Sequence, residues 1–259
     1  MASKRLIGVL TVKDGRLVKS YGYQSWRPAG GLTTALRNLD RWAADEIVVL
    51  DISRRAGLDG RVLDQIAAAG IATPLAYGGG IRSVDDLARL MDLGCDRFVV
   101  ESLLFDDPAT VAVLADFAGR QALIGSIPLV GTPDGWAIWR PAPGRGMALP
   151  SGGPAALQAF LGGLSVSEYL VTAVVAEGQE GGFPAALPES LRGLPVASVI
   201  WFGGLDTPTA AACLREPATA AVAFGNPLHE SELALPHLRA ELRSLAGEAG
   251  LRPVRLLAS

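Results

Sequence analysis

Pro74-Leu-Ala-Tyr-Gly-Gly-Gly-Ile81 and Ser198-Val-Ile-Trp-Phe-Gly-Gly-Leu205 decide the fold, because each is a short apolar run that ends in paired glycines. Gly79-Gly80-Ile81 precedes Gly203-Gly204-Leu205 by 124 residues. The same spacing, without a gap, separates Leu90 from Leu214, Phe98 from Val222 and Leu104 from Leu228. Further matches join Leu6-Ile7-Gly8 to Leu123-Ile124-Gly125, and Glu46 to Glu168. Their common order and nearly common spacing indicate an internal repeat of about 125 residues.

Apolar runs of strand length alternate with amphipathic stretches of helical length from end to end. The expected strands are Leu6–Val12, Glu46–Ile52, Pro74–Tyr77, Arg97–Glu101, Ala122–Ile127, Glu168–Val174, Ser198–Trp201 and Ala220–Phe224. The expected helices are Leu32–Ala43, Gly60–Ala69, Val84–Leu93, Pro108–Ala118, Gly153–Leu161 and Thr207–Arg215. Eight strands, most of them followed by a helix, favour a closed parallel barrel over an open sheet. We expect one α/β domain over residues 1–259, a (β/α)8 TIM barrel with half-barrels at about 1–120 and 121–259.

Composition excludes several classes of protein. The 259 residues are 49% hydrophobic and 19% charged, with a net charge of −3, so the chain is neither disordered nor basic enough to suggest nucleic acid. Cys95 and Cys213 lack metal-ligand spacing, and no cofactor or metal is expected. No signal peptide and no apolar run of about 18 residues is visible, so we expect a cytoplasmic protein without membrane contact.

Three stretches carry a resemblance to a known family. They are Arg5-Leu-Ile-Gly-Val-Leu-Thr-Val-Lys-Asp-Gly-Arg-Leu-Val-Lys19, Asp45-Glu-Ile-Val-Val-Leu-Asp-Ile52 and Tyr77-Gly-Gly-Gly-Ile-Arg82. The chain resembles the cyclase subunit of imidazole glycerol phosphate synthase, whose sister isomerase in histidine biosynthesis shares the two-fold barrel. The resemblance is strongest from Lys4 to Pro108.

Glycines at matching strand ends predict anion binding. Glycine after a strand lets backbone N–H groups approach an anion, and a helix N-terminus adds partial positive charge. The resemblance implies a ligand with a phosphate at each end. The expected phosphate and substrate contacts are Lys19, Gly80, Ser102, Glu177, Gly178, Gly204, Gly225 and Asn226. The alternatives are that the glycines only turn tight loops and that Lys19 is an exposed loop lysine; Pro227 also removes one backbone donor.

Two substitutions separate the chain from the family's chemistry. The resemblance implies aspartates as general acid and base at the ends of strands one and five, where this chain has Thr11 and Pro128. A threonine hydroxyl does not titrate near neutral pH, and proline carries no acid or base. We therefore expect the family's ring closure and fragmentation to be lost.

Other acidic residues lie near the expected catalytic end. Asp51 ends strand two, and Glu101 ends strand four, where the family has an amide side chain. We expect these two catalytic candidates to form a relocated acid–base pair across neighbouring strand ends. The alternatives are that Asp51 caps a loop and that Glu101 is a solvated rim residue. Trp201 and Phe202 either line a ligand or plug part of the pocket.

The opposite end of the barrel keeps its charges. In the family, ammonia from a glutaminase partner enters through a gate of four charged side chains, which correspond to Arg5, Glu46, Arg97 and Glu168. The alternative is that charges at this end of the barrel serve stability alone. Such a ring is costly to bury unless it is fully paired.

These observations support three hypotheses. In the first, the chain is a paralogue of the cyclase that binds a small phosphorylated or nucleotide-linked sugar and uses ammonia from a glutaminase-type amidotransferase subunit. In the second, it is a non-catalytic scaffold or sensor that binds an anion. In the third, it is a true histidine-biosynthesis cyclase, a lyase.

Overall fold

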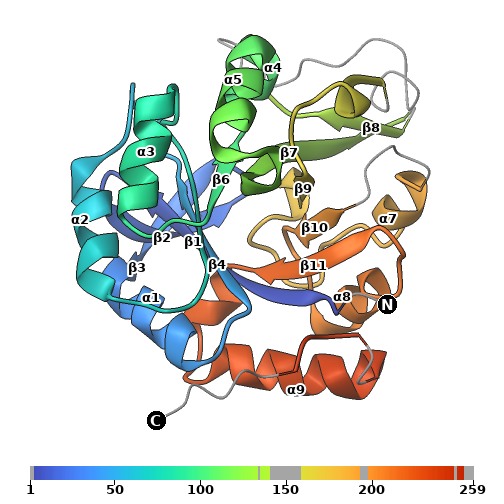
Figure 1. Ribbon diagram of the computed structural model, residues 1–259. Coiled ribbons are helices and arrows are strands. Elements are labelled where there is room, and N and C mark those ends of the chain that lie inside the picture. The colour runs from blue at the N-terminus through green and yellow to red at the C-terminus, as the bar shows by residue number, and fades with distance from the viewer. Residues whose placement is uncertain (1–2, 134, 141–158, 193–197, 248–249, 254–259) are drawn as a thin grey trace.

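A computed structural model describes residues 3–133, 135–140, 159–192, 198–247 and 250–253. Eight parallel strands form a closed barrel with helices outside it, which confirms the predicted (β/α)8 fold (Figure 1). In barrel order the strands are β1 (Arg5–Lys13), β4 (Glu46–Asp51), β5 (Leu75–Gly78), β6 (Arg97–Val100), β7 (Leu123–Thr132), β9 (Glu168–Ala173), β10 (Val199–Phe202) and β11 (Thr219–Phe224). Closure occurs between β11 and β1, where Arg5 to Gly8 pair in parallel with Ala221 to Phe224.

The helices begin where the sequence supplies capping groups. Ser83 caps the α3 helix in a capping box with Asp86, and Asp59, Asp107 and Asp206 cap the helices that follow them. The long helices are α1 (Leu32–Arg41), α2 (Gly60–Ala69), α3 (Val84–Asp92), α5 (Pro108–Ala118), α8 (Thr207–Cys213) and α9 (Ala234–Ala246). Short helical segments are α4 (Ser102–Asp106), α7 (Leu187–Ser190) and η3 (Asn226–His229).

Alternation along the strands divides the core into two parts. Inward positions fill the barrel with aliphatic side chains, among them Ile7, Val9, Val48, Ile124 and Leu170, together with Phe202. Outward positions pack against the helices and form the larger cluster. Trp201 and Phe202 are consecutive, so Trp201 belongs to the outer cluster and Phe202 to the interior.

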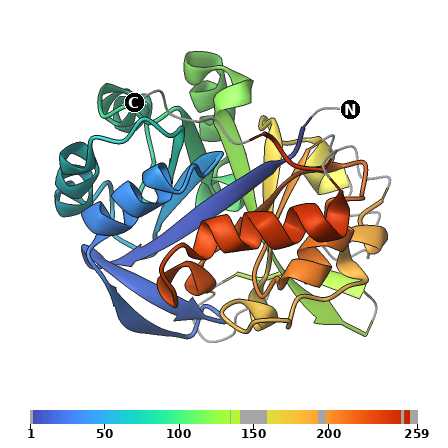
Figure 2. The same ribbon diagram turned by 90° about the horizontal axis from the view of Figure 1, so that it is seen from below.

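All eight predicted strands are found within a few residues of their expected bounds, but three strands were missed. The hairpin of β2 (Arg16–Tyr21) and β3 (Ser25–Gly30) extends from β1, and β8 (Gly135–Ile138) pairs with the extension of β7. Figure 2 shows the β2–β3 hairpin at the opposite end of the barrel from the N-terminus. The residues of β3 are almost all exposed, so this strand has no apolar face that a sequence pattern could reveal.

The structure describes only part of one predicted helix. Residues 153–158 of the predicted helix Gly153–Leu161 lie outside the described residues, whereas residues 159–162 are helical. Among the residues described, no helix has the length and apolar character needed to cross a membrane.

Candidate functional site

Four charged side chains close the amino-terminal end of the barrel. Arg5 contacts Glu46 at 2.7 Å and Glu168 at 2.5 Å, and Arg97 contacts the same two carboxylates at 3.3 and 2.5 Å. Ser198 adds a donor to Glu168 at 2.6 Å. Each arginine therefore bridges both glutamates, and we call these four residues the charge ring.

Burial and pairing act in opposite directions on the charge-ring acids. Burial alone would raise the pKa of Glu168, but the hydrogen bond and charge of Arg5 and the charge of Arg97 bring it down to about 2. Burial raises the pKa of Glu46, which is only 2% exposed. The pairing with the two arginines holds Glu168 ionised.

The carboxyl-terminal end, which we call the mouth, has a different character. Thr11 pairs with Leu50 on one side and Val18 on the other, inside the regular part of β1. Pro128 is buried opposite Thr172, and its carbonyl accepts a hydrogen bond from the Trp139 amide at 2.8 Å. The two positions where the family resemblance implies aspartates are thus integral parts of strands and carry no carboxylate.

Glu101 is a partly buried acid at the mouth. Its Oε2 accepts a hydrogen bond from Ser126 Oγ at 2.7 Å, and Ser126 lies two residues before Pro128 on the neighbouring strand β7. Burial raises the pKa of Glu101, whereas Ser126 and the charges of Arg54 and Arg140 lower it in part. The carboxylate therefore leans from β6 toward the part of β7 that carries Pro128.

Asp51 does not join Glu101. Strand β5 lies between β4 and β6, so the prediction that the two acids sit on neighbouring strand ends is wrong. Asp51 Oδ1 instead accepts hydrogen bonds from the backbone N–H of Ser53 at 2.9 Å and from its hydroxyl. These bonds are those of a residue that organises its own loop.

Sequence reasoning missed Tyr23, which the β2–β3 hairpin carries to the mouth. Its ring packs edge-on against Trp139 with centroids 5.1 Å apart. Burial, followed by the charge of Glu101, raises the pKa of Tyr23 well above its ordinary value, so its hydroxyl remains a proton donor. The hairpin is held by the Gly22 amide, which donates to the Glu177 carbonyl at 2.9 Å, and by Asn226, which donates to the Ser20 carbonyl at 2.8 Å. No signal in the sequence marked Tyr23, because the hairpin itself has no apolar pattern.

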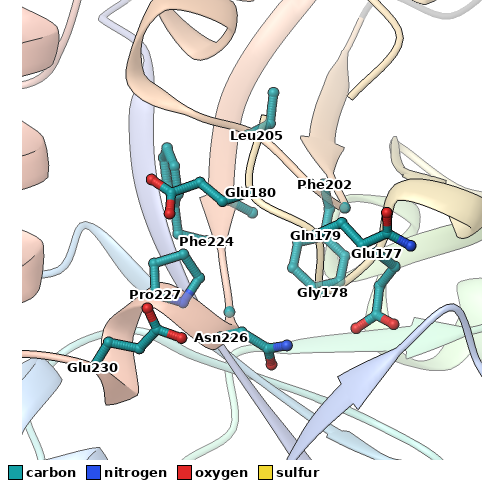
Figure 3. Close-up of a pocket in the computed structure, with 14 residues that line it drawn as sticks. Glu177, Gly178, Gln179, Glu180, Phe202, Leu205, Phe224, Asn226, Pro227 and Glu230 are labelled. Atoms are coloured by element: carbon teal, nitrogen blue, oxygen red, sulfur yellow. The ribbon is translucent and has the colours of Figure 1, made fainter. Parts of the chain in front are cut away.

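A pocket opens beside the mouth, between the ends of β9, β10 and β11 (Figure 3). It includes Phe202 but not Trp201, whose Nε1 donates to Thr219 in the outer core at 2.8 Å. Lys19, at the edge of this region, contacts Glu230 at 3.0 Å. The pocket brings together five predicted site residues of the second half, which are Glu177, Gly178, Gly204, Gly225 and Asn226.

Matching glycines hold the same backbone in both halves. Gly80 and Gly204 have φ values of +73° and +79°, which L-residues with side chains rarely adopt. A Cβ on Gly80 would lie 2.3 Å from the Gly57 carbonyl oxygen, and one on Gly204 would lie 2.4 Å from that of Ala176. Close packing against a loop therefore requires both glycines, whether or not a ligand binds there. Ser102 begins α4 just after Glu101, as Asn226 begins η3 just after Gly225.

The described residues offer no metal centre. Nowhere among them do three His, Cys, Asp or Glu side chains lie where they could hold a metal ion. Cys95 and Cys213 are both buried as free thiols.

Comparison with known proteins extends over almost the whole chain. The family described as Histidine biosynthesis protein matches residues 5–234. The imidazole glycerol phosphate synthase subunit HisF of Hyphomonas neptunium is 31% identical over 258 residues, covering 98% of this chain and 99% of the relative. Subunit HisF of Lysinibacillus sphaericus is 34% identical over 211 residues, covering 79% and 81%. Subunit HisF of Leifsonia xyli is 32% identical over 250 residues, covering 94% and 97%. These matches confirm the family resemblance and span both ends of the barrel.

Proposed function

The chain belongs to the histidine biosynthesis protein family, and from this premise we propose that it is a paralogue of the HisF subunit with altered chemistry. It binds a phosphorylated or nucleotide-linked sugar and attaches ammonia that a glutaminase subunit supplies. The observation that carries the proposal is an asymmetry along the barrel axis: the charge ring is complete, while Thr11 and Pro128 leave the mouth without the family's acid and base.

The charge ring supports the ammonia route. Its four members occupy the positions that the resemblance assigns to the gate facing a glutaminase, and all carry the expected sign of charge. Burying two glutamates with two arginines is weak evidence for stability, because apolar side chains of similar size often stabilise as well or better. A partly buried ring of this kind therefore fits a retained role in docking a glutaminase subunit or in the passage of ammonia.

Glu101 is the residue to which we assign the proton transfer. When ammonia adds to a carbonyl carbon, its lone pair forms the C–N bond and the π pair of the C=O bond moves to the oxygen. The nitrogen then carries a surplus proton, which a base takes and can deliver to that oxygen. The Glu101 carboxylate accepts a hydrogen bond from the Ser126 hydroxyl at the mouth. Burial raises the pKa of Glu101 and brings it closer to the pH at which proton transfer is efficient. Asp51 is proposed to position its loop, because both of its hydrogen bonds go to Ser53.

The anion of the ligand is assigned to the first half of the barrel. There, Gly80 packs closely against the Gly57 carbonyl of the loop that also carries Arg54, and Ser102 follows Glu101 directly. The phosphate would then lie next to the proposed proton-transfer residue, as a small sugar phosphate requires.

Co-purification and ammonia transfer test the proposal. The tagged chain is expressed with the glutaminase-type subunits of its source organism, and glutamine-dependent amination of nucleotide-linked sugars is followed by mass spectrometry. We expect a stable complex and a product that Glu101→Gln abolishes. Asp51→Asn serves as the matched comparison, with product formation reduced less than by Glu101→Gln. If neither a complex nor a product is found, the proposal is contradicted.

A non-catalytic scaffold is the second candidate, favoured by the loss of both family acids. A scaffold would bind its ligand equally well with Glu101→Gln and would change no product level. The same two variants therefore separate the two functions.

A further inference from the structure

Two hairpins meet at the mouth from opposite sides of the barrel. β1 and β7 are the first and fifth of the eight barrel strands, and each continues into a hairpin, β2–β3 on one side and β7–β8 on the other. Tyr23, in the turn of the first hairpin, packs edge-on against Trp139, which follows β8, with ring centroids 5.1 Å apart. Both rings also pack against a small buried cluster on β7, on β8 and just after β9. An apolar contact therefore spans the mouth from β1 to β7.

The backbone of the β2–β3 turn holds Tyr23 in an unfavourable conformation. Gly22 and Tyr23 have φ values of +59° and +60°, and the Gln24 N–H donates to the Tyr21 carbonyl at 3.1 Å, as in a type I′ turn. Glycine adopts this backbone readily, whereas a bulky side chain is an outlier there. Such a conformation persists only where the surrounding structure holds it, and the contacts of the Tyr23 ring do so.

The tip of the hairpin is docked on the loops that follow β9 and β11. The Gly22 N–H donates to the Glu177 carbonyl at 2.9 Å, and Asn226 Nδ2 donates to the Ser20 carbonyl at 2.8 Å. A Cβ on Gly178 would lie 2.3 Å from the Ser20 carbonyl oxygen, so only glycine permits this close approach. Gly178 and Asn226, two residues predicted to bind substrate, therefore hold the hairpin in place.

The contact between Tyr23 and Trp139 lies at the floor of the mouth. The Trp139 N–H donates to the Pro128 carbonyl, and Pro128 pairs with Thr172 across β7 and β9. Thr172 lies two positions after an interior residue of β9, so it points into the barrel, and it is fully buried. Burial, and then the charge of Glu101, raises the pKa of Tyr23, whereas the Thr172 side chain lowers it, which places the Tyr23 hydroxyl beside Thr172.

These contacts separate two parts of the mouth. The pocket of Figure 3 lies on the side of β9, β10 and β11, and its described lining includes no residue of the β2–β3 hairpin. Glu101 and Ser126 lie on the side of β6 and β7. The hairpin tip, Ser20–Tyr23, stands with Trp139 between these two parts, and we call the tip and Trp139 together the wall.

We propose that the wall determines which ligands this chain accepts, because it confines a ligand to one part of the mouth and excludes a molecule that spans both. The ligand that Glu101 reaches is then compact and does not extend from the first-half glycines to the pocket after β9. The inference rests on the proposed function and narrows its substrate class by size.

Thiol labelling of the full chain tests the wall without any ligand. Cys95 and Cys213 are buried, so a cysteine placed at Thr172, beneath the wall, serves as the reactive probe. Iodoacetamide should label Thr172→Cys slowly. Adding Tyr23→Gly should raise the labelling rate about ten-fold or more, because the floor of the mouth becomes accessible. Glycine suits the left-handed backbone at this position, so the turn itself is kept.

Two control variants make the labelling specific to the Tyr23 ring. Tyr23→Phe keeps the ring and should leave the labelling of Thr172→Cys slow. Trp26→Ala removes another aromatic ring of the same hairpin, which is 46% exposed and lies against Lys13, and should also leave the rate unchanged. Thermal unfolding of each variant confirms that it folds. A labelling rate that does not respond to Tyr23→Gly would overturn the inference.

Calorimetric titration then measures the exclusion of long ligands. The probes are ribose 5-phosphate and the aminoimidazole-ribonucleotide precursor of the family cyclase, which carries a phosphate at each end. A molecule that reaches two sites at once gains affinity from the second site. We expect the unaltered chain to bind the precursor no more tightly than ribose 5-phosphate. Tyr23→Gly should bind the precursor about ten-fold more tightly and leave the affinity for ribose 5-phosphate unchanged.

The outcomes separate this inference from the proposed function. If ribose 5-phosphate binds, then tighter binding of the precursor to the unaltered chain, or no gain from Tyr23→Gly, would overturn the inference and leave the proposed function in place. If neither probe binds although Tyr23→Gly speeds the labelling, the wall is supported and the anion site of the proposed function is contradicted.

Discussion

Strand β1 carries Arg5 at one end of the barrel and Thr11 at the other, and the two ends differ in their charged side chains. At the amino-terminal end, four charged side chains and Ser198 satisfy one another at 2.5 to 3.3 Å. At the mouth, Thr11 and Pro128 stand where the family resemblance implies acids, and Glu101 reaches in from the end of β6. Aliphatic side chains such as Val9, Val48 and Leu170 fill the barrel between the two ends. Because this packed layer separates them, chemistry at the mouth can change without disturbing the charge ring.

The largest expected effect comes from breaking the charge ring. Glu168→Ala leaves the guanidinium groups of Arg5 and Arg97 and the hydroxyl of Ser198 without their shared acceptor. Removing one partner of a buried ion pair costs about 3–5 kcal/mol, and we expect a loss of this size in the free energy of unfolding in urea. Glu189→Ala, whose side chain is 74% exposed, should change it by less than about 0.5 kcal/mol. Equal losses in the free energy of unfolding for the two variants would show that the charge ring stabilises the fold no more than an exposed side chain does.

The charge ring also gives a pH dependence with a definite direction. The pKa of Glu168 is about 2 in the folded chain, against an ordinary value of 4.5. Because the folded value is the lower one, the stabilisation is complete above about pH 4.5 and is lost as the pH falls toward 2. The difference in unfolding free energy between the unaltered chain and Glu168→Gln should therefore shrink across this range. A constant difference would contradict the pairing.

A milder change tests the identity of one cation in the ring. Arg97 bridges Glu46 and Glu168 with one guanidinium group. Arg97→Lys keeps the charge but loses the planar group that spans two carboxylates, so we expect a loss of about 1–2 kcal/mol in the unfolding free energy. A gain in stability would mean that the arginine is strained in the ring.

At the mouth the expected effects are smaller. Ser126→Ala removes the donor to Glu101, which should cost about 1 kcal/mol of stability at neutral pH and raise the pKa of Glu101 further. The carboxyl carbon of labelled glutamate, followed by NMR through a pH titration, reports this change. An unchanged titration would show that Ser126 does not hold the carboxylate.

Thr11→Val should have the smallest effect of all. Thr11 lies in the regular ladder of β1, and valine keeps its shape and strand propensity. We expect the free energy of unfolding in urea to change by less than about 0.5 kcal/mol. A larger loss would show that the hydroxyl of Thr11 makes a stabilising hydrogen bond.

The barrel was predictable because apolar runs mark its strands in the sequence and capping residues mark the starts of its helices. Its eight strands lie where the apolar runs predicted them. The β2–β3 hairpin was not predictable, because Ser25–Gly30 is exposed and owes its strand geometry to pairing with Arg16–Tyr21. Tyr23, at the turn between them, was missed for the same reason.

The site was predictable only where the chain order fixes it. The charge-ring positions follow from strand starts, and the structure brings all four together. The pairing of Asp51 with Glu101 failed because these acids end the second and fourth barrel strands, with β5 between them. The bond from Ser126 to Glu101 depends on the direction of a side chain, which no spacing in the sequence reveals.

We propose that the mouth has lost the family's chemistry while the charge ring persists. The most direct measurement is ammonium-dependent turnover of the aminoimidazole-ribonucleotide precursor that the family cyclase takes, with subunit HisF of Lysinibacillus sphaericus as the active reference. We expect turnover by the reference and none by this chain, since Thr11 and Pro128 supply no acid or base. Turnover by this chain at a rate near that of the reference would contradict this expectation.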